Sequence, residues 1–97
     1  MNSTNTSEAF YQNLKNQLYE TSSWPSAYLF KFIVPSDPKK IEKIESVFDN
    51  MGAVIKSTAS KKGTYISVSI NVVMDNPEKV IEKYQEISSE VEDVISL

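Results

Sequence analysis

Two Asx-Pro steps, Asp37-Pro38 and Asn76-Pro77, constrain the fold of this 97-residue chain more than any other feature. The residue before a proline is pushed out of the helical region of backbone space, whereas proline itself suits the first turn of a helix. Aspartate and asparagine side chains also accept hydrogen bonds from the free N–H groups of a helix start. Each step therefore predicts a helix that begins at the proline.

The segments around these two steps alternate between strand and helix patterns. Apolar residues at three- and four-residue intervals predict helices from Pro38 to Met51, where Gly52 suits the end, and from Pro77 to Ile87. Strand-like runs occur at residues 26–34, 53–60, 65–74 and 91–97. The order strand, helix, strand thus occurs twice. We expect an α+β domain of ferredoxin-like βαββαβ form, a two-layer sandwich whose antiparallel sheet carries both helices on one face.

An additional segment, residues 1–21, precedes this unit. We expect a polar tail followed by an amphipathic helix with Ser7 as its N-cap, ending before Pro25. The apolar positions of this helix are Phe10, Tyr11, Leu14, Leu18 and Tyr19. Residues 22–97 then form the ferredoxin-like domain, because a chain of this length supports only one core.

The turn between the second and third strands determines which side chains share a face. A loop of two or four residues around Lys61-Lys62-Gly63-Thr64 places the alternate apolar residues of both strands together, whereas a three-residue loop buries Lys56 beside Val68. A register change of one residue exchanges the two faces of a strand completely. We therefore expect the even loop, with Gly63 supplying the positive φ of the turn.

The residue inventory argues against catalysis. The chain has no histidine and no cysteine, and its ten basic residues are all lysines. It therefore lacks the usual proton-transfer side chain near neutral pH, the commonest zinc ligands and any thiol nucleophile. We expect no enzymatic activity, no metal and no cofactor.

The net charge of −3 argues against binding to nucleic acid or to an acidic membrane. The N-terminal residues are polar and resemble no signal peptide, and no stretch has the length of a membrane span. We expect a cytoplasmic protein.

Two segments resemble the YbeD-like family, a group of small bacterial proteins of unknown function. They are residues 24–28 (WPSAY) and residues 60–70 (SKKGTYISVSI), and the resemblance extends over about residues 22–97. The family is similar in fold to ACT-type regulatory domains, which bind small effectors such as amino acids and often pair by aligning their sheets. The resemblance thus implies an ACT-like regulatory domain.

The loop after the first strand departs from the ACT pattern. ACT-type ligand sites use a glycine-bearing loop there, whereas this chain has Pro35-Ser36-Asp37-Pro38. Two prolines remove backbone N–H donors and hinder the close approach of a ligand. The ligand-binding residues of ACT-type domains therefore have no matching positions in this loop, and the resemblance does not imply amino-acid sensing at particular residues.

The face of the sheet opposite the helices is the surface of most interest. Alternation predicts that the large aromatic residues of the first strand point inward and its lysine outward. The predicted interaction surface consists of Leu29, Lys31, Ile33, Lys56, Tyr65, Ser67, Ser69 and Asn71. Large aliphatic side chains on an open face suggest a cover. Two covers are considered, the N-terminal helix and a partner chain, alongside the alternative of isolated exposed aliphatics.

Two further groups of candidate residues are expected on or beside this surface. Ser67 and Ser69 lie within cross-strand reach of Lys31 and Lys56 as potential nucleophiles, but solvated strand residues are the far commoner case. At the hairpin, Lys61, Lys62 and Gly63 form a candidate contact for an anion or a partner.

These observations favour a non-catalytic regulatory or adaptor domain that acts through protein–protein contact, with a protein partner or a second copy of the chain. An ACT-like domain that senses an amino acid or another metabolite is the alternative.

Overall fold

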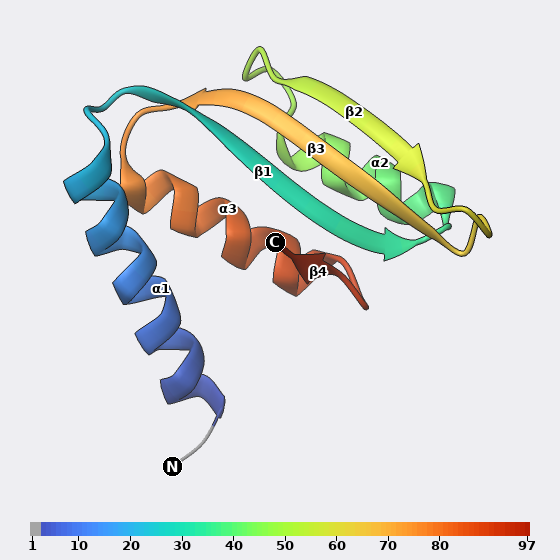
Figure 1. Ribbon diagram of the computed structural model, residues 1–97, viewed down its shortest axis with the longest axis horizontal. Coiled ribbons are helices and arrows are strands. Elements are labelled where there is room, and N and C mark those ends of the chain that lie inside the picture. Colours follow the sequence, from blue (N-terminus) through green and yellow to red (C-terminus); the bar gives the residue numbers. More distant parts are fainter. Residues whose placement is uncertain (1–2) are drawn as a thin grey trace.

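The computed structural model describes the backbone of residues 3–97 and the side chains of residues 8–97, and this part of the chain has an α+β fold. The helices are α1 (Ser3–Thr21), α2 (Pro38–Val47) and α3 (Pro77–Glu90). The strands are β1 (Ser26–Pro35), β2 (Val54–Ala59), β3 (Tyr65–Met74) and β4 (Ile95–Ser96). They form one antiparallel sheet in the order β2-β3-β1-β4 (Figure 1). None of the helices in residues 3–97 combines the length and hydrophobicity that crossing a membrane requires.

Both predicted helix starts are confirmed. Asp37 has extended backbone angles, and its carboxylate accepts a hydrogen bond of 2.9 Å from the Lys39 N–H. The Asn76 side-chain oxygen accepts the equivalent bond of 2.9 Å from the Lys79 N–H. In each case proline occupies the first turn, where its missing N–H is not needed.

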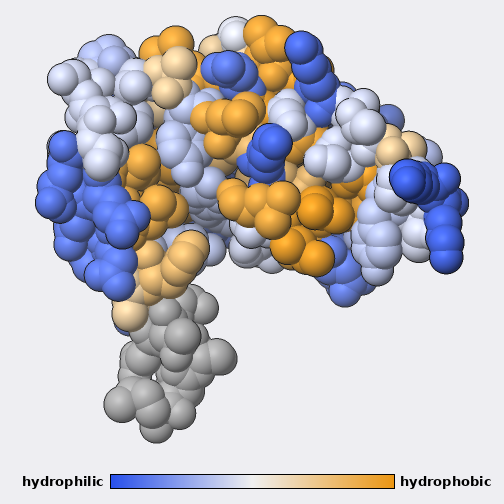
Figure 2. Space-filling model, viewed as in Figure 1, coloured by the Kyte–Doolittle hydropathy of each residue, from blue (hydrophilic) through white to orange (hydrophobic). Residues whose placement is uncertain are grey.

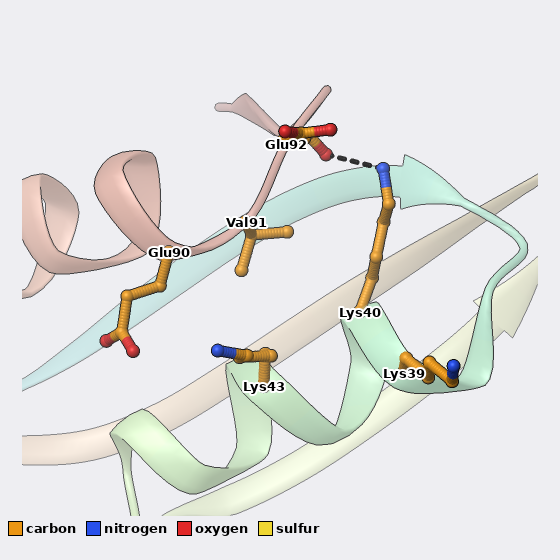
Figure 3. A pocket seen from close by; sticks show the side chains of 6 residues that line it. All are labelled: Lys39, Lys40, Lys43, Glu90, Val91 and Glu92. Atoms are coloured by element: carbon orange, nitrogen blue, oxygen red, sulfur yellow. Dashed lines mark hydrogen bonds between the residues drawn. The ribbon is translucent and has the colours of Figure 1, made fainter.

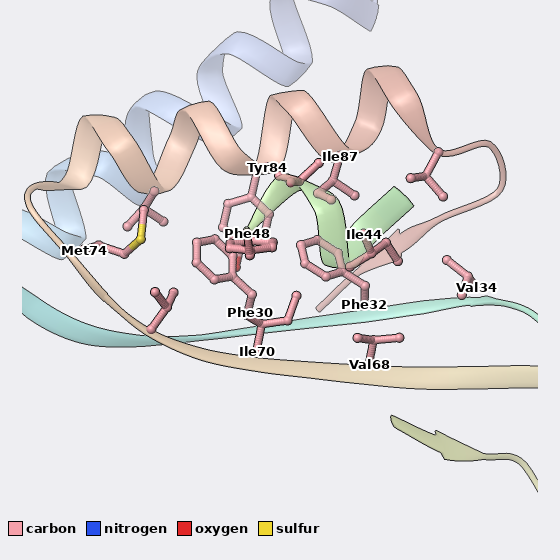
Figure 4. Packing of buried hydrophobic residues seen from close by; sticks show 14 residues of the cluster. Phe30, Phe32, Val34, Ile44, Phe48, Val68, Ile70, Met74, Tyr84 and Ile87 are labelled. Atoms are coloured by element: carbon pink, nitrogen blue, oxygen red, sulfur yellow. The ribbon is translucent and has the colours of Figure 1, made fainter. Parts of the chain in front are cut away.

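The core lies between the sheet and the layer formed by α2 and α3, as Figure 4 shows. Phe30 and Phe32 of β1 are fully buried, which confirms the predicted inward face of this strand. The Phe30 ring centroid lies 5.0 Å from that of Phe48 and 5.1 Å from that of Tyr84. These aromatic contacts join β1 to α3 and to the residue that directly follows α2.

The predicted register of the β2–β3 hairpin is confirmed. Ala59 pairs with Ile66, and the Ser60 N–H donates to the Tyr65 carbonyl at 2.8 Å, which leaves a four-residue loop. Gly63 has φ of 72° there, as expected, and Gly52 has φ of 71°. Inward-facing residues of the two strands are therefore paired with one another.

The predicted end of α2 at Met51 is wrong, because the helix ends at Val47 and turns occupy residues 48–52. The reason lies in tertiary contacts. Phe48 is almost fully buried in the core, and the Lys83 ammonium of α3 donates to the Val47 carbonyl at 2.8 Å. This bond satisfies a carbonyl that the next helical turn would otherwise use.

The last strand is also shorter than the predicted 91–97. Val91 is buried at the end of α3, and Asp93 has a positive φ of 61°, which is incompatible with extended pairing. Only Ile95 and Ser96 pair with β1.

Helix α1 differs from the prediction in its start and in its location. It begins at Ser3 rather than after Ser7, since residues 3–6 contain neither proline nor glycine to interrupt a helix. Met1 and Asn2 of the predicted polar tail lie outside the described residues. Its contacts are with α3, on the helical side of the sheet (Figures 1 and 4). The hypothesis that the N-terminal helix covers the open sheet face is therefore wrong. Leu14 and Leu18 pack at the edge of the core instead.

Candidate protein-interaction surface

The open face of the sheet is the side that carries no helix of residues 3–97, and it consists of rows of side chains that cross the strands. Residues directly opposite each other in antiparallel strands project from the same face. The central row joins Lys31 of β1, Ser69 of β3 and Lys56 of β2. The next row toward the hairpin joins Ile33, Ser67 and Thr58. The row on the other side joins Leu29, Asn71 and Val54.

All eight predicted surface residues lie on this face. Ile33, Ser67 and Ser69 are half-buried by their neighbours, and the other five are exposed. The structure thus brings together the residues Leu29, Lys31, Ile33, Lys56, Tyr65, Ser67, Ser69 and Asn71.

Three apolar residues that the sequence analysis missed add to this surface. Val54, Val73 and Ile95 are 59%, 62% and 53% exposed. Val54 and Val73 continue the alternation of Lys56 and Asn71, so the same two-residue period could have found them. Ile95 is paired with Ile33, and only the long-range placement of β4 beside β1 reveals this contact.

The open face contains two shallow hollows. One of about 240 Å³ is lined by Leu29, Val54, Lys56, Ser69 and Asn71. The other, of about 300 Å³, is lined by Ile33, Thr58, Ala59, Ser60, Tyr65 and Ser67. Figure 2 shows this side of the molecule, where hydrophobic side chains and isolated hydrophilic ones alternate over the strands. The surface therefore offers apolar contact with polar groups at fixed places.

The serines of this face are placed beside lysines without bonding to them. Ser69 lies opposite both Lys31 and Lys56, as predicted, whereas Ser67 lies opposite Ile33 and Thr58. No side-chain hydrogen bond joins either serine to a lysine within the described residues. A serine nucleophile needs a base within hydrogen-bond reach, so the geometry favours a binding role over a reactive one.

The predicted hairpin contact lies at the Tyr65 end of this face. The Gly63 N–H donates to the Ser60 carbonyl at 2.9 Å, and the Ser36 hydroxyl donates to the Gly63 carbonyl. The Ser36 N–H also donates to the Thr64 carbonyl at 3.0 Å. The hairpin is thus held against the β1–α2 loop, while Lys61 and Lys62 remain exposed.

The groups with shifted pKa values lie away from the open face. Burial, followed by the hydrogen bond with the Tyr28 hydroxyl, raises the pKa of Tyr84 far above its ordinary value. A hydrogen bond between Tyr19 and Glu78 raises the pKa of the tyrosine and lowers the pKa of the carboxylate. The first pair lies in the core and the second joins α1 to α3, so both have structural roles.

A hollow of about 270 Å³ lies between the start of α2 and the end of α3, shown in Figure 3. The Lys40 ammonium donates to the Glu92 carbonyl at 2.8 Å and lies 3.5 Å from the Asp93 carboxylate. The hollow is lined by Lys39, Lys40, Lys43, Glu90, Val91 and Glu92. The lining carries charges of both signs, and the described residues contain no cluster suited to a metal ion.

A narrower crevice of about 190 Å³ lies between α1 and the C-terminal residues. Aromatic and aliphatic side chains dominate its walls, and the Tyr28–Tyr84 hydroxyl pair is at its side. Local sequence patterns do not reveal this crevice, because it forms only where α1 and the C-terminal residues meet in the folded chain. Its lining consists of Phe10, Tyr11, Leu14, Tyr28, Tyr84, Ser96 and Leu97.

Comparison with known proteins yields one match. A family model described as a protein of unknown function (DUF493) matches residues 20–95. No curated protein and no solved structure matches the chain. The family match covers most of the chain and confirms the resemblance seen in its sequence.

Proposed function

The chain belongs to the DUF493 family, that of the YbeD-like small bacterial proteins of unknown function, and we propose that it is a non-catalytic regulatory or adaptor domain. It binds another protein on its open sheet face. The observation that carries the proposal is that residues 3–97 leave this face uncovered although it bears large apolar side chains. These exposed side chains are Leu29, Val54, Tyr65, Val73 and Ile95. Several large apolar side chains exposed on one face are typical of an interaction site.

The absence of histidine and cysteine from the sequence supports a non-catalytic role. Ser69, the serine that lies opposite two lysines on the open face, has no side-chain hydrogen bond to either of them in the described structure. A cytoplasmic location belongs to the same proposal.

The finer classification of residues 22–97 as a ferredoxin-like, ACT-like domain is also proposed. The strand order β2-β3-β1-β4, with β1 and β3 at the centre, supports it. So does the position of α2 and α3 on the same face of the sheet (Figure 4).

A substitution pair on the open face tests the proposal. The tagged wild-type protein is used to capture partners from a lysate of its host, in parallel with the variants Leu29→Asn/Val73→Asn and Phe10→Asn. Phe10 is a matched control because it is an equally exposed apolar residue on α1. We expect one protein to bind the wild type and the control and to be lost from the open-face variant, with direct binding measured by calorimetry on the purified pair. A captured set that the open-face variant leaves unchanged contradicts the proposal.

Metabolite sensing, the alternative function, finds less support in the loop after β1. The Ser36 N–H donates to Thr64 and the Asp37 N–H donates to the Pro35 carbonyl at 2.7 Å, so neither is free to bind a ligand. A thermal-shift screen against amino acids and common metabolites is therefore expected to leave the melting temperature unchanged, because a ligand raises it only by binding the native state. A concentration-dependent rise with one metabolite would instead favour sensing.

A further inference from the structure

We infer that the partner of the open face is an acidic protein segment in which a carboxylate is flanked by apolar side chains. This inference rests on the proposed function and goes beyond it by naming the chemistry of the partner. Its basis is the distribution of charge over the molecule.

Positive and negative charges are separated between the sheet and the rest of the chain. The strands and the β2–β3 hairpin carry four lysines, Lys31, Lys56, Lys61 and Lys62, and none of the thirteen acids. The helices and the other connections carry all thirteen acids and six lysines, a formal charge of −7. The sheet side is therefore basic although the chain as a whole is acidic, and it attracts a negatively charged partner.

The central row provides the site for the carboxylate. Lys31 and Lys56 both lie opposite Ser69, so their backbones are about 9.5 Å apart, twice the spacing between neighbouring strands. Neither lysine has an ion pair within the described residues. A carboxylate placed above Ser69 accepts hydrogen bonds from the serine hydroxyl and from both ammonium groups, and charge-assisted bonds of this kind are the stronger ones.

Apolar residues stand on both sides of this row. Leu29 and Val54 lie in the row on one side, and Ile33 and Ile95 lie in the row on the other. Successive rows on one face are about 6.7 Å apart, because residues two positions apart share a face. The partner segment therefore presents an apolar side chain, a carboxylate and a second apolar side chain at intervals of about 6–7 Å. An extended segment has this spacing at alternate residues.

The same geometry disfavours three other occupants. A second copy of the chain, placed face to face, sets lysines against lysines, which is repulsive. A bilayer suits an apolar centre with cations at the rim, whereas Lys31 and Lys56 stand between the apolar rows. Single-stranded nucleic acid is bound by several stacking aromatic side chains beside basic groups, and Tyr65 is the only aromatic residue on this face among the described residues.

Selection from a random dodecapeptide display library against the full-length protein tests the inference. We expect the recovered peptides to carry aspartate or glutamate between apolar residues. The affinity of a synthesised peptide should fall about tenfold or more for Lys31→Glu/Lys56→Glu, and similarly when the peptide acid is replaced by its amide. The matched control Lys39→Glu/Lys43→Glu reverses two exposed lysines on α2 and should bind within about twofold of the wild type.

The possible outcomes separate this inference from the proposed function. Peptides without acidic residues, whose binding is lost with Leu29→Asn/Val73→Asn, would overturn the inference and leave the interaction surface standing. Recovery of no peptide that depends on the open face would overturn both. The protein is also tested for binding to a thymidine oligonucleotide and to phosphatidylserine vesicles. If it binds one of them and Lys31→Glu/Lys56→Glu abolishes that binding, the partner of the open face is nucleic acid or a membrane and not an acidic protein segment. Circular dichroism melting of each variant shows that it is folded.

Discussion

At the scale of single residues, the Tyr28–Tyr84 pair shows how the core accommodates polar groups. Tyr84 is only 5% exposed, and its hydroxyl lies 2.8 Å from that of Tyr28. The ring centroids are 6.2 Å apart at nearly a right angle, an arrangement that aromatic rings favour. Each hydroxyl is the other's side-chain partner in the described structure, so removing one leaves the other unsatisfied.

The substitution Tyr28→Phe should lower the free energy of unfolding by about 1–2 kcal/mol, because the Tyr84 hydroxyl then stays buried without its partner. The double variant Tyr28→Phe/Tyr84→Phe should recover part of this loss, since no unpaired hydroxyl remains. Urea unfolding of the two single variants and the double variant measures both effects. Strictly additive losses would show that the hydroxyls do not interact.

Alkaline pH should destabilise the protein partly through Tyr84. Burial and the bond with Tyr28 raise the pKa of Tyr84 in the folded state above its value in the unfolded chain. A group of this kind contributes stability that is complete below the unfolded pKa, near 10, and that is lost as the pH rises beyond it. The free energy of unfolding should therefore fall above about pH 10, and less steeply in Tyr84→Phe. An identical slope in the variant would exclude this tyrosine as the cause.

At the scale of elements, α1 is an addition to the helical layer that leaves the sheet face free. Tyr11, Leu14 and Leu18 are only partly buried against the core. Two hydrogen bonds also hold the helix, one from Tyr19 to Glu78 and one of 3.1 Å from the Trp24 indole to the Leu18 carbonyl. This helix therefore contributes to stability and lies away from the proposed interaction surface.

Deletion of residues 1–21 should lower the free energy of unfolding by about 2–4 kcal/mol, from the loss of three half-buried apolar side chains. The same deletion should leave binding at the open face unchanged, provided that the shortened chain folds at the temperature of the assay. Thermal unfolding and the calorimetric titration of the captured partner measure the two quantities. A selective loss of affinity in a folded, shortened protein would place α1 in the binding site.

At the scale of the whole molecule, the sheet has one side covered by helices and one side open, and the charges follow the same division. The open side is basic and apolar, and the covered side is acidic. Self-association through the open face therefore brings like charges together, while a complementary partner meets both an apolar and an electrostatic match.

The purified protein should accordingly be a monomer at micromolar concentration and physiological salt, as measured by multi-angle light scattering. A dimer that Leu29→Asn/Val73→Asn dissociates would contradict this expectation and would make a second copy of the chain the occupant of the open face.

Much of the fold and most of the candidate surface follow from local sequence patterns. The Asp37-Pro38 and Asn76-Pro77 steps set both helix starts, because capping and proline geometry act within a few residues. The two-residue period of the strands determined which side chains point outward, since one face of each strand must be buried. This period, together with the preference for burying the aromatic residues and exposing the lysine of the first strand, predicted that Leu29, Lys31 and Ser69 lie on the open face.

Three features of the protein depend on contacts between segments that are distant in the sequence, and only the tertiary structure reveals them. The end of α2 is set by burial of Phe48 and by the bond from Lys83, neither of which a local pattern contains. An amphipathic helix such as α1 can bury its apolar side against any exposed hydrophobic surface, so its place beside α3 required the assembled core. The same holds for the position of Ile95 next to Ile33, because strand pairing joins residues that are far apart in the chain. Sequence periodicity thus determined which residues face outward, and long-range packing decided which of them meet and which surface remains uncovered.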